Sequence, residues 1–259
     1  MDLKPVTSNG NSAPRLQDLK IKIFADGADG AIREVGALPY IAGFTTNPTL
    51  MCKAGVKDYR SFADEMLKAV AGRPISFEVL SEEMDEIEGE AREIASWGEN
   101  IYVKVPATNT RGESTRAVVR RLTRSGVKVN VTAMMTLARV EEMAEALAGG
   151  APSFVSIFAG RIADSGRDPI PIMKEAKQLL LHRAPQAELL WASPREVLNL
   201  FQADEAGCDI ITVTLDLLKK LTLVGKDLDD FALETVKMFY DDGKKAGLSL
   251  KQAPVAVTR

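Results

Sequence analysis

The chain has 259 residues, 46% of them hydrophobic, with 33 basic and 36 acidic residues and a formal net charge of -3. This near balance argues against a nucleic-acid or membrane-surface footprint, and no apolar run is long enough to span a bilayer. The two cysteines, Cys52 and Cys208, lie far apart without CxxC spacing, so we expect reduced core thiols in a cytoplasmic protein.

Residues 1–18 contain Pro, Asn, Ser and Gly and lack the apolar segment of a signal peptide, so we expect a loose, disordered tail. Beyond this tail, strand-like apolar runs alternate with stretches of helical spacing. The expected strands are 21–25, 40–44, 75–79, 101–105, 128–132, 154–158, 188–192 and 210–214. The expected helices are 28–37, 57–70, 82–97, 113–125, 137–148, 170–183, 195–206 and 214–221.

Eight strand–helix repeats predict an α/β fold of the (β/α)8 TIM-barrel type. An open doubly wound sheet is the alternative, and the lack of a Gly-rich first turn disfavours it. A further amphipathic stretch, about 228–246, follows the eighth repeat and predicts an extra C-terminal helix. We therefore expect one barrel domain over 19–259 that includes this helix.

Alternation within each strand predicts which side chains face the barrel interior. In IYVKVP (101–106), Val103 and Val105 oppose Tyr102 and Lys104; the apolar pair must pack on the helices, so the other pair points inward. The same pattern gathers polar residues at the C-terminal ends of the strands, where barrel enzymes place their chemistry. These residues are Asp26, Asn47, Glu78, Lys104, Asn130, Thr132 and Ser156. Any one hydroxyl or amide could be a satisfied core group, but so many are costly unless they serve a ligand or one another.

A buried lysine beside carboxylates has two interpretations. Burial favours the neutral amine, which can attack a ketone and form a Schiff base that draws electrons from a neighbouring C–C bond. That chemistry needs a carboxylate to remove a hydroxyl proton, and it needs no metal. Alternatively, Lys104 extends to solvent or forms a structural ion pair with Glu78 or Asp26. Alternation alone leaves both interpretations open.

Two motifs resemble those of a known family. GFTTNPTLM (43–51) resembles the first signature of transaldolases, and IYVKVPAT (101–108) resembles the strand that carries their Schiff-base lysine. Weaker similarity continues, in the family's order, through VNVTAM (129–134), FVSIFAGRIAD (154–164), LLWAS (189–193) and AGCDIITVTLDLL (206–218). The chain length is similar to that of the short transaldolases and fructose-6-phosphate aldolases.

The resemblance implies a role for each matching position and no cofactor beyond the covalent Schiff base. Lys104 would carry the Schiff base, and Asp26 would deprotonate the C4 hydroxyl of the donor. Glu78 would act through a water that Thr132 positions. The implied substrate contacts are the amides of Asn47 and Asn130, the hydroxyls of Ser156 and Ser193, and the phosphate-binding guanidinium groups of Arg161 and Arg195. A surface ion pair is the alternative for Arg195.

Glu78 and Phe158 distinguish transfer from cleavage within this resemblance. Aldolases of the family tend to carry Gln and Tyr at these positions, and the tyrosine hydroxyl helps water and protons reach the carbon intermediate. The pair present here implies a transaldolase, which moves a dihydroxyacetone unit from a ketose phosphate such as fructose 6-phosphate or sedoheptulose 7-phosphate to an aldose phosphate. The alternatives are aldolase-type release of dihydroxyacetone and a non-catalytic sugar-phosphate-binding barrel.

Two features bear on partners. Pro194 follows Ser193 where the family usually has an aromatic residue, which leaves the exact sugars open. In the predicted last helix, Phe231, Val236 and Phe239 recur at helical spacing. We expect this helix to link copies of the chain in a homo-oligomer, with folding back onto its own barrel as the alternative. Sugar phosphates are the other expected partners; nucleic acid and membrane are not.

Overall fold

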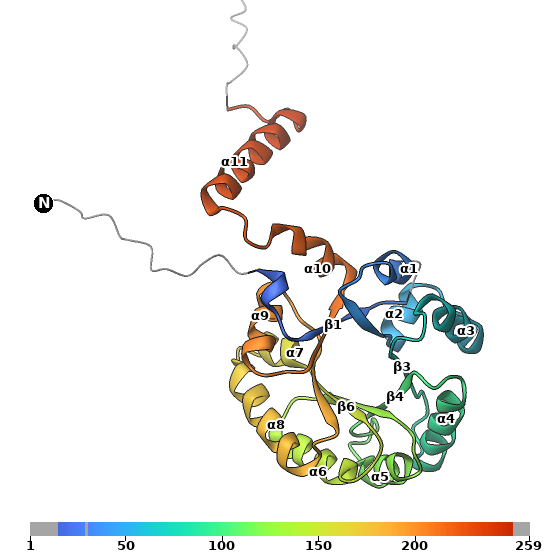
Figure 1. Cartoon of the computed structure of the whole chain (residues 1–259). Coiled ribbons are helices and arrows are strands. Elements are labelled where there is room, and N and C mark those ends of the chain that lie inside the picture. The colour runs from blue at the N-terminus through green and yellow to red at the C-terminus, as the bar shows by residue number, and fades with distance from the viewer. Residues whose placement is uncertain (1–14, 29–30, 251–259) are drawn as a thin grey trace, which may run out of the picture. The chain divides into compact units, whose positions relative to one another are not determined.

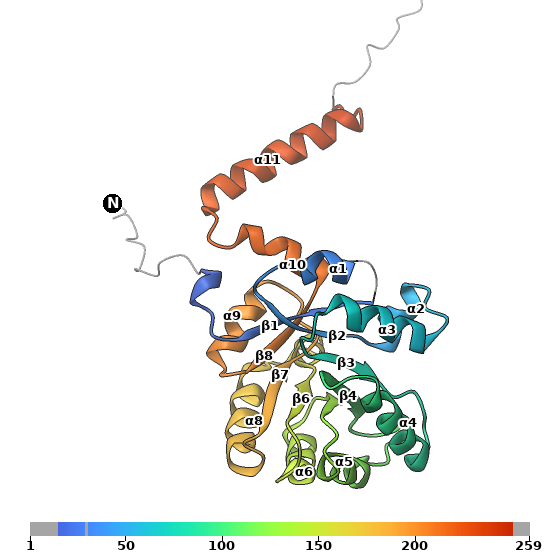
Figure 2. The ribbon, with the colours of Figure 1, turned by 45° about the vertical axis from the view of Figure 1, so that its right-hand side comes forward.

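The computed structural model describes residues 15–28 and 31–250. Its eight strands form one closed barrel in chain order, and all neighbouring strands are parallel (Figures 1 and 2). The strands are β1 (Lys22–Asp26), β2 (Ile41–Thr45), β3 (Ile75–Glu78), β4 (Ile101–Pro106), β5 (Val129–Met134), β6 (Ser153–Ile157), β7 (Ala187–Trp191) and β8 (Ile210–Thr214). The predicted (β/α)8 barrel is therefore confirmed.

Helices surround the strands of the barrel (Figure 1). The α-helices of the described chain are α1 (Ala31–Gly36), α2 (Pro48–Lys53), α3 (Tyr59–Ala69), α4 (Met84–Ser96), α5 (Arg116–Arg124), α6 (Leu137–Leu147), α7 (Ala159–Asp164), α8 (Ile170–Arg183), α9 (Leu198–Glu205), α10 (Leu215–Lys219) and α11 (Leu228–Lys245), with short 3-10 helices η1 (Leu16–Asp18) and η2 (Lys220–Leu223). The predicted extra C-terminal helix corresponds to α11. Residues 1–14 of the predicted tail lie outside the described residues.

Two short helices, α2 and α7, were missed by the sequence analysis. A signal for α2 was present, because Asn47 caps it by accepting a 3.0 Å hydrogen bond from the Leu50 amide, and Pro48 occupies its first turn. Phe158 precedes α7 and makes no side-chain capping bond. The start of α7 therefore carries no capping signal in the sequence.

The chain divides into two compact units. One is the barrel, Leu19–Leu221; the other carries η1 and α11 from the two ends of the chain. Within the second unit, Asp227 caps α11 by accepting from the amides of Asp229 and Asp230. A single domain over 19–259 that includes the last helix stays a prediction.

The barrel interior is apolar toward the N-terminal ends of the strands and polar toward their C-terminal ends. Phe24, Tyr102 and Phe154 fill its apolar part: the Tyr102 and Phe154 rings stack with centroids 3.8 Å apart, and Phe24 meets Phe154 edge-on at 5.6 Å. On the outer face of the strands, Val103 and Val105 are fully buried against the helices, as alternation predicted. This aromatic cluster fills the barrel interior beneath the polar side chains at the C-terminal ends of the strands.

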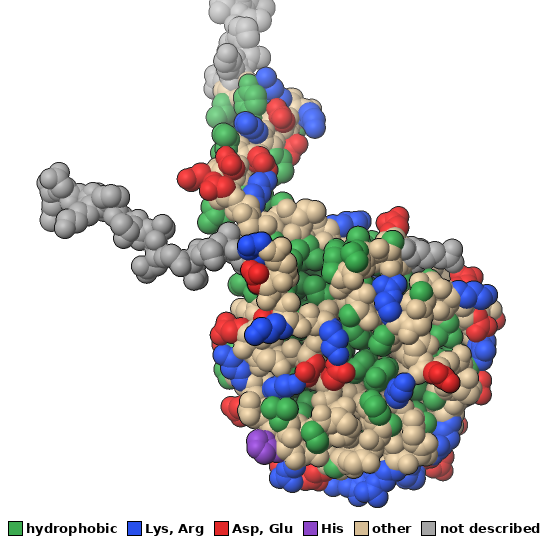
Figure 3. All heavy atoms as spheres, in the orientation of Figure 1, with side chains coloured by type: hydrophobic (Ala, Val, Ile, Leu, Met, Phe, Trp, Pro, Cys, Tyr) green, Lys and Arg blue, Asp and Glu red, His purple; other side chains and the backbone are tan. Residues whose placement is uncertain are grey.

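The surface of the barrel carries charges of both signs, and Figure 3 shows them interspersed over the visible face. Many lie in exposed ion pairs such as Arg116–Glu145, which contribute little to stability. The cysteines correct one prediction: Cys208 is buried, whereas Cys52 is exposed. Cys52 follows the buried Met51 on the one-sided helix α2 and so faces outward.

Gly160 of α7 lies against the backbone that follows β7. A Cβ at Gly160 would lie 1.5 Å from the carbonyl oxygen of Ser193, so only glycine fits. Ser193 itself has a φ of 61°, in the left-handed region that non-glycine residues rarely adopt. The contact therefore fixes the loop after β7 against α7.

Gly160→Ala should lower the free energy of unfolding by at least about 1–3 kcal/mol, because the new methyl meets backbone that cannot rotate away. The matched control is Gly89→Ala, since a Cβ at Gly89 in α4 meets nothing within 4 Å. That control should gain roughly 0.5–1 kcal/mol from helix propensity. Urea unfolding of both variants measures this, and equal stabilities would contradict the close contact.

Candidate active site

A cavity of about 450 Å³ opens at the C-terminal ends of the barrel strands. All of the side chains predicted for the site except Asn130 line it. They are Asp26, Asn47, Glu78, Lys104, Thr132, Ser156, Phe158, Arg161, Ser193 and Arg195. Residues from five strands, β1 and β3 to β6, and from the segments after β2, β6 and β7 thus converge on one cavity.

Lys104 lies inside the wall of this cavity. Only 7% of the surface of Lys104 is exposed to solvent, and its Nζ donates a 2.8 Å hydrogen bond to the Thr46 carbonyl. The nearest carboxylate oxygen is Glu78 Oε2, 3.7 Å from Nζ. Glu78, Lys104 and Asn130 pair in register on β3, β4 and β5, so their side chains form one inward-facing row. Lys104 therefore does not extend to solvent.

Asp26 ends β1 beside this row. Its Oδ1 accepts a 2.7 Å hydrogen bond from the Thr45 hydroxyl, and the Thr212 hydroxyl hydrogen-bonds in turn to Thr45. Burial raises the pKa of the Asp26 carboxyl; the Lys104 charge and the Thr45 bond oppose this rise without cancelling it. A carboxylate with a raised pKa is a stronger base than an ordinary aspartate.

Glu78 also has a raised pKa. Burial is the main cause, the nearby Lys104 ammonium opposes it, and Asp26 adds to it. The Glu78 peptide is held by Tyr59 of α3, whose hydroxyl accepts from the Glu78 N–H and donates to the Glu78 carbonyl, both at 2.8 Å. Burial raises the pKa of Tyr59 too, so its hydroxyl keeps its proton.

Thr132 presents a buried hydroxyl that has no hydrogen-bond partner within the described chain. It follows Val131, where the pairing of β5 with β6 shifts register, and it precedes Ala133, which has a φ of 62°. This bulge lets one extra residue into β5 while Thr132 keeps facing the cavity. An unpaired buried hydroxyl on a cavity wall suits a bound water or a ligand.

Asn130 belongs to the same row as Lys104 but does not line the cavity. Its side-chain oxygen accepts from the Ser156 hydroxyl at 2.7 Å, and its amide nitrogen donates to the Ser76 hydroxyl at 3.0 Å. Asn47 has its side-chain oxygen occupied as the cap of α2, which leaves its amide N–H groups for the cavity that it lines. Of the two predicted amides, Asn47 thus lines the cavity, whereas Asn130 bonds to Ser76 and Ser156.

Arg161 and Arg195 lie together at the rim of the cavity. The Arg161 guanidinium lies 5.7 Å from the centroid of the Phe158 ring. Arg195 forms an exposed ion pair with Asp164, with Nε 3.0 Å from Asp164 Oδ1, and these bonds lower the pKa of Asp164. Arg195 therefore combines both interpretations given above: it lines the cavity and takes part in a surface ion pair.

Four positioning groups were missed by the sequence analysis: Thr45, Thr46, Tyr59 and Thr212. Alternation along IITVT (210–214) could have found Thr212, which shares the inward face with Ile210. Tyr59 carried no such signal, because it reaches Glu78 from a helix on the outer layer.

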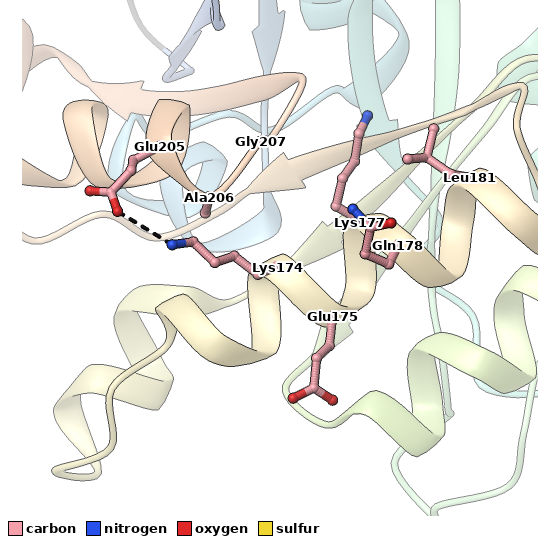
Figure 4. Close-up of a pocket in the computed structure, with 8 residues that line it drawn as sticks. All are labelled: Lys174, Glu175, Lys177, Gln178, Leu181, Glu205, Ala206 and Gly207. Carbon is pink, nitrogen blue, oxygen red and sulfur yellow. Dashed lines mark hydrogen bonds and ion pairs between the residues drawn. The ribbon is translucent and has the colours of Figure 1, made fainter.

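A larger, shallower hollow of about 770 Å³ lies on the outside of the barrel, formed by α8 and the turn between α9 and β8 (Figure 4). There Lys174 reaches Glu205, while Glu175 points away from the other labelled side chains. Lys177 is paired with Asp209 at 2.6 Å. With both lysines paired, this hollow lacks the convergent reactive groups of the barrel cavity.

Within residues 15–28 and 31–250, no helix is long and apolar enough to cross a membrane. Nor do these ranges contain a group of three or more His, Cys, Asp or Glu side chains that could hold a metal ion.

Comparisons with known proteins agree with the geometry. The family described as transaldolase/fructose-6-phosphate aldolase matches residues 23–257. A probable transaldolase of Streptococcus agalactiae serotype V is 33% identical over 226 residues, which cover 87% of this chain and 100% of that protein. Probable transaldolases of Thermoanaerobacter sp. (strain X514) and Herpetosiphon aurantiacus are 35% and 36% identical, over 89% and 83% of this chain and 100% and 92% of theirs. The chain therefore belongs to the transaldolase/fructose-6-phosphate aldolase family.

Proposed function

We propose that the protein is a Schiff-base transaldolase that transfers a dihydroxyacetone unit from a ketose phosphate to an aldose phosphate. The observation that carries this proposal is the position of Lys104: its Nζ is buried in a sugar-sized cavity, 3.7 Å from Glu78, with Asp26 on the same wall. Probable-transaldolase relatives at 33–36% identity support the same activity.

In the first step, the Lys104 ammonium loses a proton, and the resulting amine attacks the C2 carbonyl of the donor and forms a carbinolamine. Loss of water then gives the Schiff base. Glu78, with its raised pKa, can carry the proton that the departing water needs, and the unpaired Thr132 hydroxyl can hold this water.

In the second step, Asp26 takes the proton of the C4 hydroxyl. The C3–C4 bond breaks, its electron pair moves into the protonated imine, and the aldehyde leaves. The raised pKa of Asp26 strengthens it as a base, and the Thr212–Thr45 hydroxyl chain fixes its direction. The three-carbon enamine stays bound to Lys104.

The enamine then attacks an acceptor aldehyde, and the aldehyde oxygen takes the proton held by Asp26. Water hydrolyses the new imine, and the product ketose leaves. Phe158 presents a ring without a hydroxyl to this cavity, which disfavours protonation of the enamine by water. Arg161 and Arg195 line this cavity, and we propose that they bind the phosphate of donor and acceptor, because guanidinium groups suit phosphate oxygens. Fructose 6-phosphate and sedoheptulose 7-phosphate are the donors that we propose.

Lys104→Met should abolish transfer and leave the barrel folded, since methionine fills similar space without a charge. Borohydride added with fructose 6-phosphate should leave a three-carbon adduct on Lys104 in the unmodified protein and none in the variant, as read by mass spectrometry. Lys128→Met is the control, because Lys128 lies at the opposite end of the strands and its Nζ bonds the Glu99 carbonyl. Activity of the Lys104 variant within tenfold of the unmodified protein would exclude the Schiff base.

The unmodified protein should transfer dihydroxyacetone to erythrose 4-phosphate at least about tenfold faster than it releases it, because a missing general acid typically costs about 10²–10⁴-fold. Phe158→Tyr should move this ratio toward release. Phe201→Tyr, which adds the same hydroxyl on α9 away from the cavity, should leave it unchanged. The test is to quantify the transfer product and free dihydroxyacetone for all three proteins. Rapid release of dihydroxyacetone by the unmodified protein would favour the aldolase alternative.

We also propose that α11 links copies of the chain in a homo-oligomer. Phe231, Val236 and Phe239 share one side of this helix at spacings that favour packing against another surface. A chain that ends at Leu228 should therefore have a smaller mass by light scattering than the full chain. An unchanged assembly after truncation would show that another surface joins the subunits.

A further inference from the structure

The β2–β3 ladder stops beside the proposed catalytic lysine. The Phe44 amide of β2 donates to the Pro74 carbonyl at 2.8 Å, and the Thr46 amide, directly after β2, donates to the Ser76 carbonyl at 3.1 Å. In a parallel ladder the next donor from this chain is residue 48, and its acceptor is the Glu78 carbonyl. Residue 48 is a proline and has no N–H to donate.

The same interruption affects the opposite bond. The regular partner of the Glu78 amide would be the Thr46 carbonyl. In the structure, that carbonyl instead accepts a hydrogen bond from Lys104 Nζ at 2.8 Å. Both backbone groups of Glu78 that face β2 therefore need another partner, because an unpaired buried peptide group is costly.

The Tyr59 hydroxyl meets both needs. It accepts from the Glu78 amide and donates to the Glu78 carbonyl, each at 2.8 Å, which a hydroxyl can do at once. Its ring is fixed by edge-on contacts with Trp97 at 5.6 Å and Phe77 at 6.2 Å. The Tyr59 side chain thus takes the place of the two backbone hydrogen bonds that Glu78 would otherwise make with the chain after β2.

We infer that Tyr59 is a positioning residue for the Schiff-base reaction. By holding the Glu78 peptide, it leaves the Thr46 carbonyl to orient the Lys104 amine and keeps the Glu78 side chain 3.7 Å from that amine. This inference rests on the proposed function. It assigns a role to a residue that does not line the cavity.

Tyr59→Phe tests the inference, because it removes only the hydroxyl. The variant should lower kcat for transfer from fructose 6-phosphate to erythrose 4-phosphate about tenfold while KM stays within about twofold, since orientation and not binding is lost. The rate of borohydride trapping on Lys104 should fall in parallel. The Glu78 amide should lose its protection from hydrogen exchange.

Phe62→Leu is the matched control. Phe62 lies on the same helix and packs edge-on against Phe77 at 6.2 Å, but it makes no bond to Glu78. This variant should lose stability without a change in kcat or in Glu78 protection. If it loses as much kcat as Tyr59→Phe, the effect of Tyr59 is only structural and the inference is wrong.

Two other results would be decisive. Unchanged kcat in Tyr59→Phe, together with normal trapping in the unmodified protein, would overturn the inference and leave the proposed function intact. Failure to trap any adduct in the unmodified protein would overturn the proposed function, and the catalytic role of Tyr59 with it. Hydrogen exchange at Glu78 would still show whether Tyr59 holds that peptide, so the two failures are distinguishable.

Discussion

The mouth of the barrel holds one ammonium and two carboxyl groups, those of Lys104, Glu78 and Asp26. Removing these groups from water costs free energy, and neighbouring polar groups must offset that cost. The Thr46 carbonyl, the Thr45 hydroxyl and the mutual attraction of the charges offset only part of this cost. Burial therefore raises the pKa of both carboxyl groups. A carboxyl group with a raised pKa contributes stability below its ordinary titration range, and this contribution is lost as the pH rises through the raised pKa.

Stability must then come from parts of the barrel that do no chemistry. The aromatic cluster of Phe24, Tyr102 and Phe154 and the aliphatic outer face of the strands bury large apolar surfaces. Two cavity residues, Ala133 and Ser193, have left-handed backbone conformations, each of which costs about 1 kcal/mol or more. The stability from the buried apolar surfaces must offset this cost too. Strain of this kind gathers where a fold positions functional groups.

The sequence predicted the layout of the barrel because one rule, alternation within buried strands, repeats eight times. It placed Lys104 and Glu78 on the inward face and put the valines around them on the outward face, as the structure confirms. Alternation could not predict features that depend on contacts between residues far apart in the sequence. Tyr59 meets Glu78 only because α3 packs over the interrupted edge of β3, and Cys52 is exposed only because α2 is short and one-sided.

The two cysteines differ in a way that makes the unmodified chain useful for spectroscopy. Cys208 is buried, and burial raises the pKa of its thiol to about 12, so it forms almost no reactive thiolate near neutral pH. Cys52 is exposed on α2, the helix whose first residues, Pro48 to Leu50, line the cavity. A thiol-reactive fluorophore would attach at this position alone. It would test for binding of the proposed sugar phosphates through the helix that borders the site, without any engineered mutation.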